Sequence, residues 1–198
     1  MRTYYYNGGY QSVYNRGVAA SIESQNPVVG GGDASSSAWV MICKLAGGTG
    51  YEYMQIGWTE DHAVTGEVPR FFWECSNSYY DWDIVYGSLS GSSGTHSFKI
   101  TDDATNYYLQ IDGSTKTTKA KSTVPWTPNA IEIFGETYYQ TDQCPGTTSN
   151  HCSFGPVSYK TTSGVWAQAS VTEDIDLSTM ANDLQNGERS WTIWDTRY

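Results

Sequence analysis

Positive charge is scarce in this chain. Eleven lysines and arginines stand against 21 aspartates and glutamates, so the net charge at pH 7 is −10. The isoelectric point accordingly lies near 4.5. Nucleic acids and anionic membranes are bound through clustered lysine and arginine side chains. We therefore expect neither a nucleic acid nor a membrane surface as a partner.

Long apolar segments are also missing. No run approaches the roughly 18 apolar residues that a membrane-spanning helix needs. The segment Met1–Tyr4 lacks the apolar stretch of a signal peptide, so we interpret the sequence as a mature domain. No proline-rich or highly charged linker divides the 198 residues. This favours a single domain that spans residues 1–198 and is long enough to bury a sizeable core.

Aromatic residues and glycine are abundant, with 16 tyrosines, eight tryptophans and 20 glycines. This composition is typical of pleated strands joined by tight turns. Short apolar runs do alternate with turn-forming segments, and the run that starts at Val18 follows Asn7-Gly8-Gly9. The predicted strands are Val18–Ile22, Ala38–Cys43, Tyr51–Trp58, Phe71–Cys75, His96–Thr101, Tyr107–Ile111, Ile131–Tyr139, Val157–Tyr159, Val165–Val171 and Trp191–Trp194. One short helix is predicted at Ser178–Leu184. The fold class is therefore all-β, a two-sheet antiparallel jelly-roll sandwich of the concanavalin or lectin type.

Four cysteines bear on the compartment. Cys144 and Cys152 flank a polar, turn-forming segment, and this spacing predicts a disulfide that staples a loop. Such a bond implies an oxidising compartment, so we expect a secreted protein. Cys43 and Cys75 lie in apolar strand-like runs and are either bridged or two buried thiols. His151 beside Cys152 forms no recognisable zinc spacing, so no metal or cofactor is expected.

Two of the predicted strands have one apolar and one polar-aromatic face, because alternate residues of a strand share a face. The core faces carry Met54, Ile56 and Trp58 in one strand and Ile131, Ile133 and Gly135 in the other. The opposite faces carry Tyr51, Tyr53, Gln55 and Gly57, and Glu132, Phe134, Glu136 and Tyr138. If the sheet curves with these polar faces on its concave side, the groups converge in an aromatic groove.

The order of several motifs resembles that of a known family. The motifs are Ala38-Trp39-Val40, Met54-Gln55-Ile56-Gly57-Trp58, Phe72-Trp73-Glu74 and Asn129-Ala130-Ile131-Glu132-Ile133-Phe134-Gly135-Glu136, followed by the Cys144–Cys152 loop. Together they are similar to the fungal glutamic peptidases (eqolisins), over roughly residues 5 to 170. The Ile-Glu-x-x-Gly-Glu form also resembles the neprosin-like prolyl-cleaving peptidases. The resemblance implies a two-sheet jelly roll and an acid-active endopeptidase that acts on polypeptides.

The resemblance also implies roles for particular residues. Gln55 matches the catalytic glutamine and Glu136 the catalytic glutamate, while Trp39 matches an active-site tryptophan and Glu74 a supporting acid. We expect Tyr53, Glu132, Phe134 and Tyr138 to contact substrate along the groove. The sequence departs from the eqolisin pattern Trp-Val-Gly-Ile-Asp, because Met41 and Cys43 replace the glycine and the aspartate. Neprosins carry a glutamate where this chain has Gln55.

One acid and one amide suffice for peptide hydrolysis by water. Glu136 would accept a proton from the water and return it to the leaving nitrogen, and Gln55 would donate to the oxyanion. Each of these residues also has an ordinary structural interpretation. Glu136 could be a solvated acid, Gln55 an ordinary polar residue of a strand, and Trp39 part of the core. A groove rich in tyrosine and tryptophan also suits a non-catalytic carbohydrate- or peptide-binding module, or an inactive peptidase relative. In each case we expect a monomer.

Overall fold

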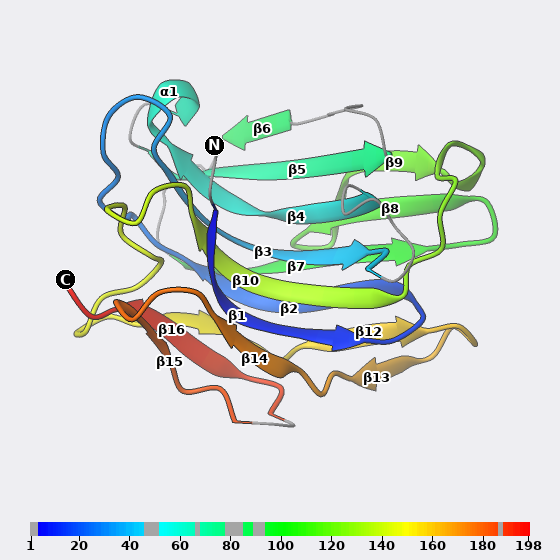
Figure 1. Ribbon diagram of the computed structural model, residues 1–198. Helices are drawn as coiled ribbons and strands as arrows, with labels where there is room; N and C mark the ends of the chain where they lie inside the picture. Colours follow the sequence, from blue (N-terminus) through cyan, green and yellow to red (C-terminus); the bar gives the residue numbers. More distant parts are fainter. Residues whose placement is uncertain (1–3, 46–51, 66–67, 78–84, 89–93, 186–187) are drawn as a thin grey trace.

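Two antiparallel sheets stack face to face, as Figure 1 shows, and this confirms the predicted sandwich. The computed structural model describes residues 4–45, 52–65, 68–77, 85–88, 94–185 and 188–198. The first sheet runs in the order β14 (Thr172–Ile175), β1 (Tyr5–Ser12), β10 (Ala130–Thr137), β3 (Ser35–Cys43), β4 (Glu52–Asp61), β5 (Arg70–Asn77) and β6 (Val85–Ser88). All of its strand pairs are antiparallel.

Part of the second sheet is seen behind the first in Figure 1. Its main path runs in the order β15 (Met180–Asn182), β16 (Trp191–Asp195), β11 (Cys152–Phe154), β2 (Asn15–Ser24), β7 (Gly94–Asp102), β8 (Asn106–Ile111) and β9 (Ser114–Ala120). Off this path, β12 (Ser158–Thr161) pairs with β2 and with β13 (Trp166–Gln168). Strands from the beginning and the end of the chain therefore share each sheet.

Helix is limited to short pieces in the described residues, namely α1 (His62–Thr65) and the 3₁₀ turn η1 (Lys121–Thr123). Within these same residues, no helix has the length and apolar character needed to cross a membrane. The predicted helix at Ser178–Leu184 is wrong. This segment contains β15, which pairs with β16 through Met180 opposite Asp195. A seven-residue helix is too short to be stable on its own, and the edge of β16 offers backbone hydrogen bonds instead.

The hydrophobic core fills the space between the two sheets. The inward face of the first sheet supplies Val40, Ile42, Met54, Ile56, Trp58, Ile131 and Ile133, all fully buried. The second sheet contributes Val18, Ile22, Phe98 and Ile100 to the same core, and these residues are also fully buried. The predicted core face of β4 is thereby confirmed. Tyr51, which was predicted for the opposite face, lies outside the described residues. The other face of the first sheet is left for the site.

Strand β1 was not expected, because Asn7-Gly8-Gly9 reads as a turn. The structure places these residues inside β1, between β10 and β14. A Cβ atom on Gly8 would lie 2.2 Å from the carbonyl oxygen of Ile133, so glycine permits the close approach of β10. The fully buried Asn7 donates a hydrogen bond of 2.8 Å to the carbonyl oxygen of Ala181. The triplet therefore serves packing rather than chain reversal.

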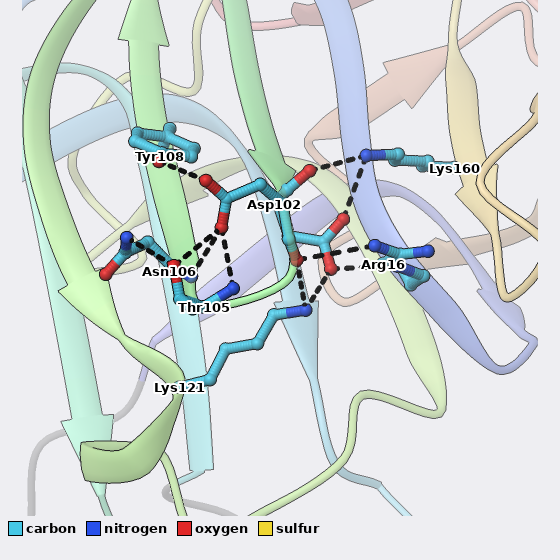
Figure 2. A network of polar contacts seen from close by, with 8 residues as sticks. Arg16, Asp102, Thr105, Asn106, Tyr108, Lys121 and Lys160 are labelled. Carbon is cyan, nitrogen blue, oxygen red and sulfur yellow. Dashed lines mark hydrogen bonds and ion pairs between the residues drawn. The ribbon is translucent and has the colours of Figure 1, made fainter.

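An ion cluster around one buried carboxylate stabilises one end of the second sheet, as Figure 2 shows. The Asp102 carboxylate has no exposed surface and accepts hydrogen bonds from Arg16 at 2.8 Å, from Lys160 at 2.9 Å and from Lys121. Burial by itself raises the pKa of Asp102, but these three hydrogen bonds outweigh it and the net pKa is lowered. We call these four residues the Asp102 network. It ties β7 to β2 and β12.

Candidate active site

A groove of about 930 Å³ lies on the outward face of the first sheet. Strands β14, β1, β10, β3, β4 and β5 contribute to it. Its lining residues are Tyr4, Tyr6, Tyr10, Trp39, Met41, Cys43, Lys44, Leu45, Glu52, Tyr53, Gln55, Glu74, Glu132, Phe134, Glu136 and Asp174. Lys44 is the single cation among these residues, which include five carboxyl groups. Among the residues described, no group of three or more potential ligands could hold a metal ion.

The strand register places the polar residues in a definite pattern. Glu132 of β10 pairs with Met41 of β3, Met41 pairs with Gln55 of β4, and Gln55 pairs with Glu74 of β5. These four residues therefore form one row across the sheet. Glu136 lies four residues further along β10 than Glu132, on the same face because alternate residues share a face. Met41 occupies the place in the row between Glu132 and Gln55.

Glu136 sits among aromatic side chains. Its Oε2 accepts a hydrogen bond of 2.7 Å from Nε1 of Trp39. The rings of Tyr6 and Phe134 lie 5.6 Å apart, and Phe134 and Trp39 are also 5.6 Å apart. Burial raises the pKa of Glu136 to about 8, against the Trp39 hydrogen bond and with added repulsion from Glu74 and Glu132. In acid the free protein therefore holds Glu136 protonated.

Gln55 is held by a second acid. Its Nε2 donates a hydrogen bond of 2.6 Å to Oε2 of Glu74, whose Oε1 accepts a bond of 2.5 Å from the Tyr53 hydroxyl. Burial raises the pKa of Glu74, and these two hydrogen bonds oppose that rise. A primary amide has two N–H donors, and the Glu74 contact uses one of them. The arrangement fixes the Gln55 amide and leaves it a donor for a ligand.

Trp39 can lie beside Glu136 because of a glycine on the neighbouring strand. Gly57 of β4 pairs with Trp39 of β3. A Cβ atom on Gly57 would lie 2.1 Å from the carbonyl oxygen of Ala38 and 2.7 Å from the Cβ of Trp39. Any larger residue would displace β3 or β4 and the Trp39 side chain with it.

Most of the predicted site residues line one groove: Gln55, Glu136, Trp39, Tyr53, Glu74, Glu132 and Phe134. In this conformation the Gln55 amide and the Glu136 carboxyl contact different partners, Glu74 and Trp39. Tyr138 is not among the lining residues. It lies just past the end of β10, is buried, and packs edge-on against Tyr4 with the ring centres 5.4 Å apart.

Sequence reasoning missed the part of the groove that β1 and β14 supply. Tyr6 and Tyr10 of β1 line it together with Tyr4 just before that strand, and Asp174 of β14 pairs with Gly8 beside them. The signal was present, because Tyr4, Tyr6 and Tyr10 are two and four residues apart, and even separations place strand residues on one face. The glycines between them concealed it.

The predicted disulfide is wrong, since Cys144 and Cys152 are both free and fully buried. Each sulfur has another partner: Asn7 Nδ2 lies 3.8 Å from Cys144 Sγ, and Cys152 Sγ donates to the Glu23 carbonyl oxygen at 3.3 Å. A loop spacing fixes only the chain length between two cysteines, whereas a disulfide also requires the two sulfurs to meet within a narrow range of geometry. The support that this bond gave to secretion is lost.

Cys43 and Cys75 are two buried thiols, the second of the alternatives left open by the sequence. Cys43 lines the groove, whereas Cys75 belongs to the core between the sheets. Because they occupy opposite faces of the first sheet, no bond between them can form without rebuilding a strand.

The similarity of this chain to known proteins lies in its structure rather than in its sequence. No family model matches the chain, and no curated protein matches it. Solved structures do match. A Scytalido-glutamic peptidase with a peptide-based transition-state analogue has a TM-score of 0.62 at 13% identity, covering 99% of this chain and 100% of that one. SCP-B, an eqolisin in complex with the tripeptide Ala-Ile-His, has a TM-score of 0.58 at 11% identity with the same coverage.

The chain has the fold of the glutamic peptidases. This confirms the resemblance drawn from its motifs, at the level of architecture. Identities of 11–13% establish the fold alone and leave the roles of individual residues to be argued from the site. Glu136 and Gln55 both line the groove on the outward face of the first sheet.

Proposed function

We propose that the protein is a peptide hydrolase in which Glu136 moves the proton and Gln55 stabilises the oxyanion. One observation carries the proposal: a buried carboxyl with a pKa raised to about 8 shares an aromatic groove with an amide that a second acid holds in place. Perturbed acids in a concave groove are characteristic of catalytic sites. The fold, shared with two peptidases that bind peptide ligands, supports the same reaction class.

The reaction needs only water. The O–H bond of a water in the groove breaks as its oxygen bonds to the peptide carbonyl carbon, and Glu136 takes the proton. The negative charge that develops on the carbonyl oxygen receives a hydrogen bond from the Gln55 amide. The carbon–nitrogen bond then breaks while Glu136 returns its proton to the nitrogen. No net charge or proton is left on the protein.

The raised pKa of Glu136 makes the pH profile informative. A carboxyl with a pKa of about 8 is ionised in roughly one molecule in ten thousand at pH 4. If Glu136 enters the reaction as the base, kcat/KM rises about tenfold per pH unit through the acid range. If it enters protonated, as the donor, kcat/KM is level in acid and falls above pH 8. The mechanism above, in which Glu136 takes a proton from water, predicts the first case.

The test is digestion of a denatured protein from pH 3 to pH 8, with pepstatin present and products read by mass spectrometry. We expect new peptide ends from the parent and none from Glu136→Gln, because an amide cannot carry the proton. Gln55→Ala should lose about 10²–10³ in kcat. Glu173→Gln is the matched control, since Glu173 is exposed on β14 and does not line the groove. All variants must retain the parent far-UV spectrum.

Two outcomes refute the proposal. The catalytic assignment is wrong if Glu136→Gln cleaves as well as the parent. If the parent cleaves nothing at any pH but is retained on an immobilised saccharide, the groove is a carbohydrate-binding surface. The aromatic lining is the observation that favours this second candidate. Secretion and a monomeric state stay predictions.

A further inference from the structure

Cys43 occupies a place in the groove that the proposed reaction does not use. Its Sγ lies 3.4 Å from Oε1 of Glu132, and the alternative acceptor, the carbonyl oxygen of Ala130, is further away at 4.0 Å. Cys43 is 4% exposed and lines the groove. In the register Cys43 pairs with Ala130, so Glu132 is its diagonal neighbour on the same face of the sheet.

We propose that Cys43 is a positioning residue: its thiol donates a hydrogen bond that holds the Glu132 carboxylate in its charged form, facing the neighbouring Glu136. The inference rests on the proposed function only for its effect on activity. The hydrogen bond and its influence on the two acids can be measured without any substrate.

The thiol suits this task because it keeps its proton. Burial raises the pKa of Cys43 far above its ordinary value, and the nearby Glu132 raises it further. The S–H group therefore stays a donor through the acidic and neutral pH range. A carboxyl group in its place would donate only when protonated, in acid.

The groups that face Glu132 come from three other strands. Tyr10 of β1 pairs directly with Glu132, Asp174 of β14 adds repulsion, and Cys43 of β3 supplies the hydrogen bond. Burial raises the pKa of Glu132, the Cys43 hydrogen bond lowers it, and Asp174 raises it. The thiol is thus the contact that favours the charged form.

Glu136 responds to the charge on Glu132. Besides Glu132 on its own strand, it faces Tyr6 of β1, Trp39 of β3 and Glu74 of β5. Tyr6 stays neutral because its own pKa is raised well above the ordinary value by burial and by the nearby acids. Repulsion from Glu74 and Glu132 adds to the burial that raises the pKa of Glu136. Cys43 therefore tunes Glu136 through Glu132.

The test follows the glutamate carboxyl carbons by NMR over a pH titration of ¹³C-labelled protein without substrate. In Cys43→Ala, Glu132 should bind its proton about fivefold more tightly, the effect of losing one weak hydrogen bond to a carboxylate. Glu136 should titrate at lower pH than in the parent. Cys43→Ser keeps a donor and should restore both titrations. Cys75→Ala removes a buried thiol from the opposite face and should leave both unchanged.

A second measurement needs no substitution at Cys43. In the parent, the S–H stretching band of Cys43 should shift as Glu132 titrates. Unchanged Glu132 and Glu136 titrations in Cys43→Ala, or a stationary S–H band in the parent, overturn the inference. If the titrations move but no variant hydrolyses peptide, the inference stands and the proposed function fails. If peptide is hydrolysed, the pH limb of kcat/KM should move with Glu136 in Cys43→Ala.

Discussion

Replacing Glu136 by glutamine should stabilise the protein at neutral pH. Burial in the groove raises the pKa of Glu136 from 4.5 to about 8. The buried carboxyl therefore lowers the free energy of unfolding at any pH at which it ionises in the unfolded chain. Glutamine has the same shape and carries no charge at any pH. Its side-chain oxygen can still accept the hydrogen bond that Trp39 Nε1 donates to Glu136.

The sign of the effect follows from the two titrations. Below about pH 4 the carboxyl is protonated in both the folded and the unfolded chain, so its contribution to stability is fully present. As pH rises, the unfolded chain releases the proton first while the folded protein keeps it. The free energy of unfolding of the parent therefore falls until the pH passes the folded pKa, and is level beyond that.

The expected difference is small in acid and large near neutrality. The pKa of Glu136 is 4.5 in the unfolded chain and about 8 in the folded protein. The free energy of unfolding of Glu136→Gln should therefore exceed that of the parent by about 3 kcal/mol at pH 7 and by less than about 0.5 kcal/mol at pH 4. Urea unfolding followed by tryptophan fluorescence at both pH values measures it. The exposed Glu173→Gln variant should stay within about 0.5 kcal/mol of the parent throughout. Equal pH dependence in Glu136→Gln and the parent would refute the buried, protonated state of Glu136.

Three further predictions concern the scaffold. Asp102→Asn should destabilise the protein by about 3 kcal/mol at pH 7 in urea unfolding, because three cations lose their buried partner. Since the folded pKa of Asp102 is lowered, the parent loses this advantage as pH falls through that pKa, and a gap that persists in strong acid would contradict the ion-pair explanation. Gly57→Ala should cost at least about 2 kcal/mol and reduce any peptidase activity, whereas Gly30→Ala, where a Cβ meets nothing nearer than 3.5 Å, should cost far less; equal losses would show that the Trp39 contact is unimportant. Denatured, unreduced protein should contain four titratable thiols, and a count of two would restore one disulfide.

The alternation of residue types predicted the strands that build the site. Strands β4 and β10 each combine an apolar face with a polar-aromatic one, and a period of two assigns each residue to its face. The structure places Gln55, Glu132 and Glu136 on the groove side accordingly. What alternation cannot supply is the register between strands, which comes from hydrogen-bonded pairing across long separations. The row of residues from Glu132 to Glu74 could therefore not be predicted from the sequence alone.

The failures share a physical cause, which is that tertiary contacts overrode local signals. Asn7-Gly8-Gly9 has the composition of a turn, yet the closeness of β10 requires the glycine at position 8. Ser178–Leu184 has a helix cap and apolar spacing, yet the edge of β16 recruits three of its residues as β15. The spacing of Cys144 and Cys152 suits a staple, yet other polar groups occupy both sulfurs. Local propensity is a weak guide wherever a sheet edge or a close backbone contact competes with it.

Two buried acids outside the groove have partners of a different kind from those of three acids in the groove. At the end of the second sheet, Asp102 is neutralised by three cations, and Asp195 is paired with Arg197 at 2.6 Å. Pairing a buried acid with a cation in this way offsets the cost of an uncompensated buried charge. In the groove, by contrast, the partners of the acids are neutral donors: Tyr53 and Gln55 for Glu74, Trp39 for Glu136 and Cys43 for Glu132. These contacts orient the carboxyls yet leave their pKa values raised. Acids kept in this state destabilise the fold at neutral pH, and raised pKa values of this kind are what the proposed exchange of protons with a ligand requires.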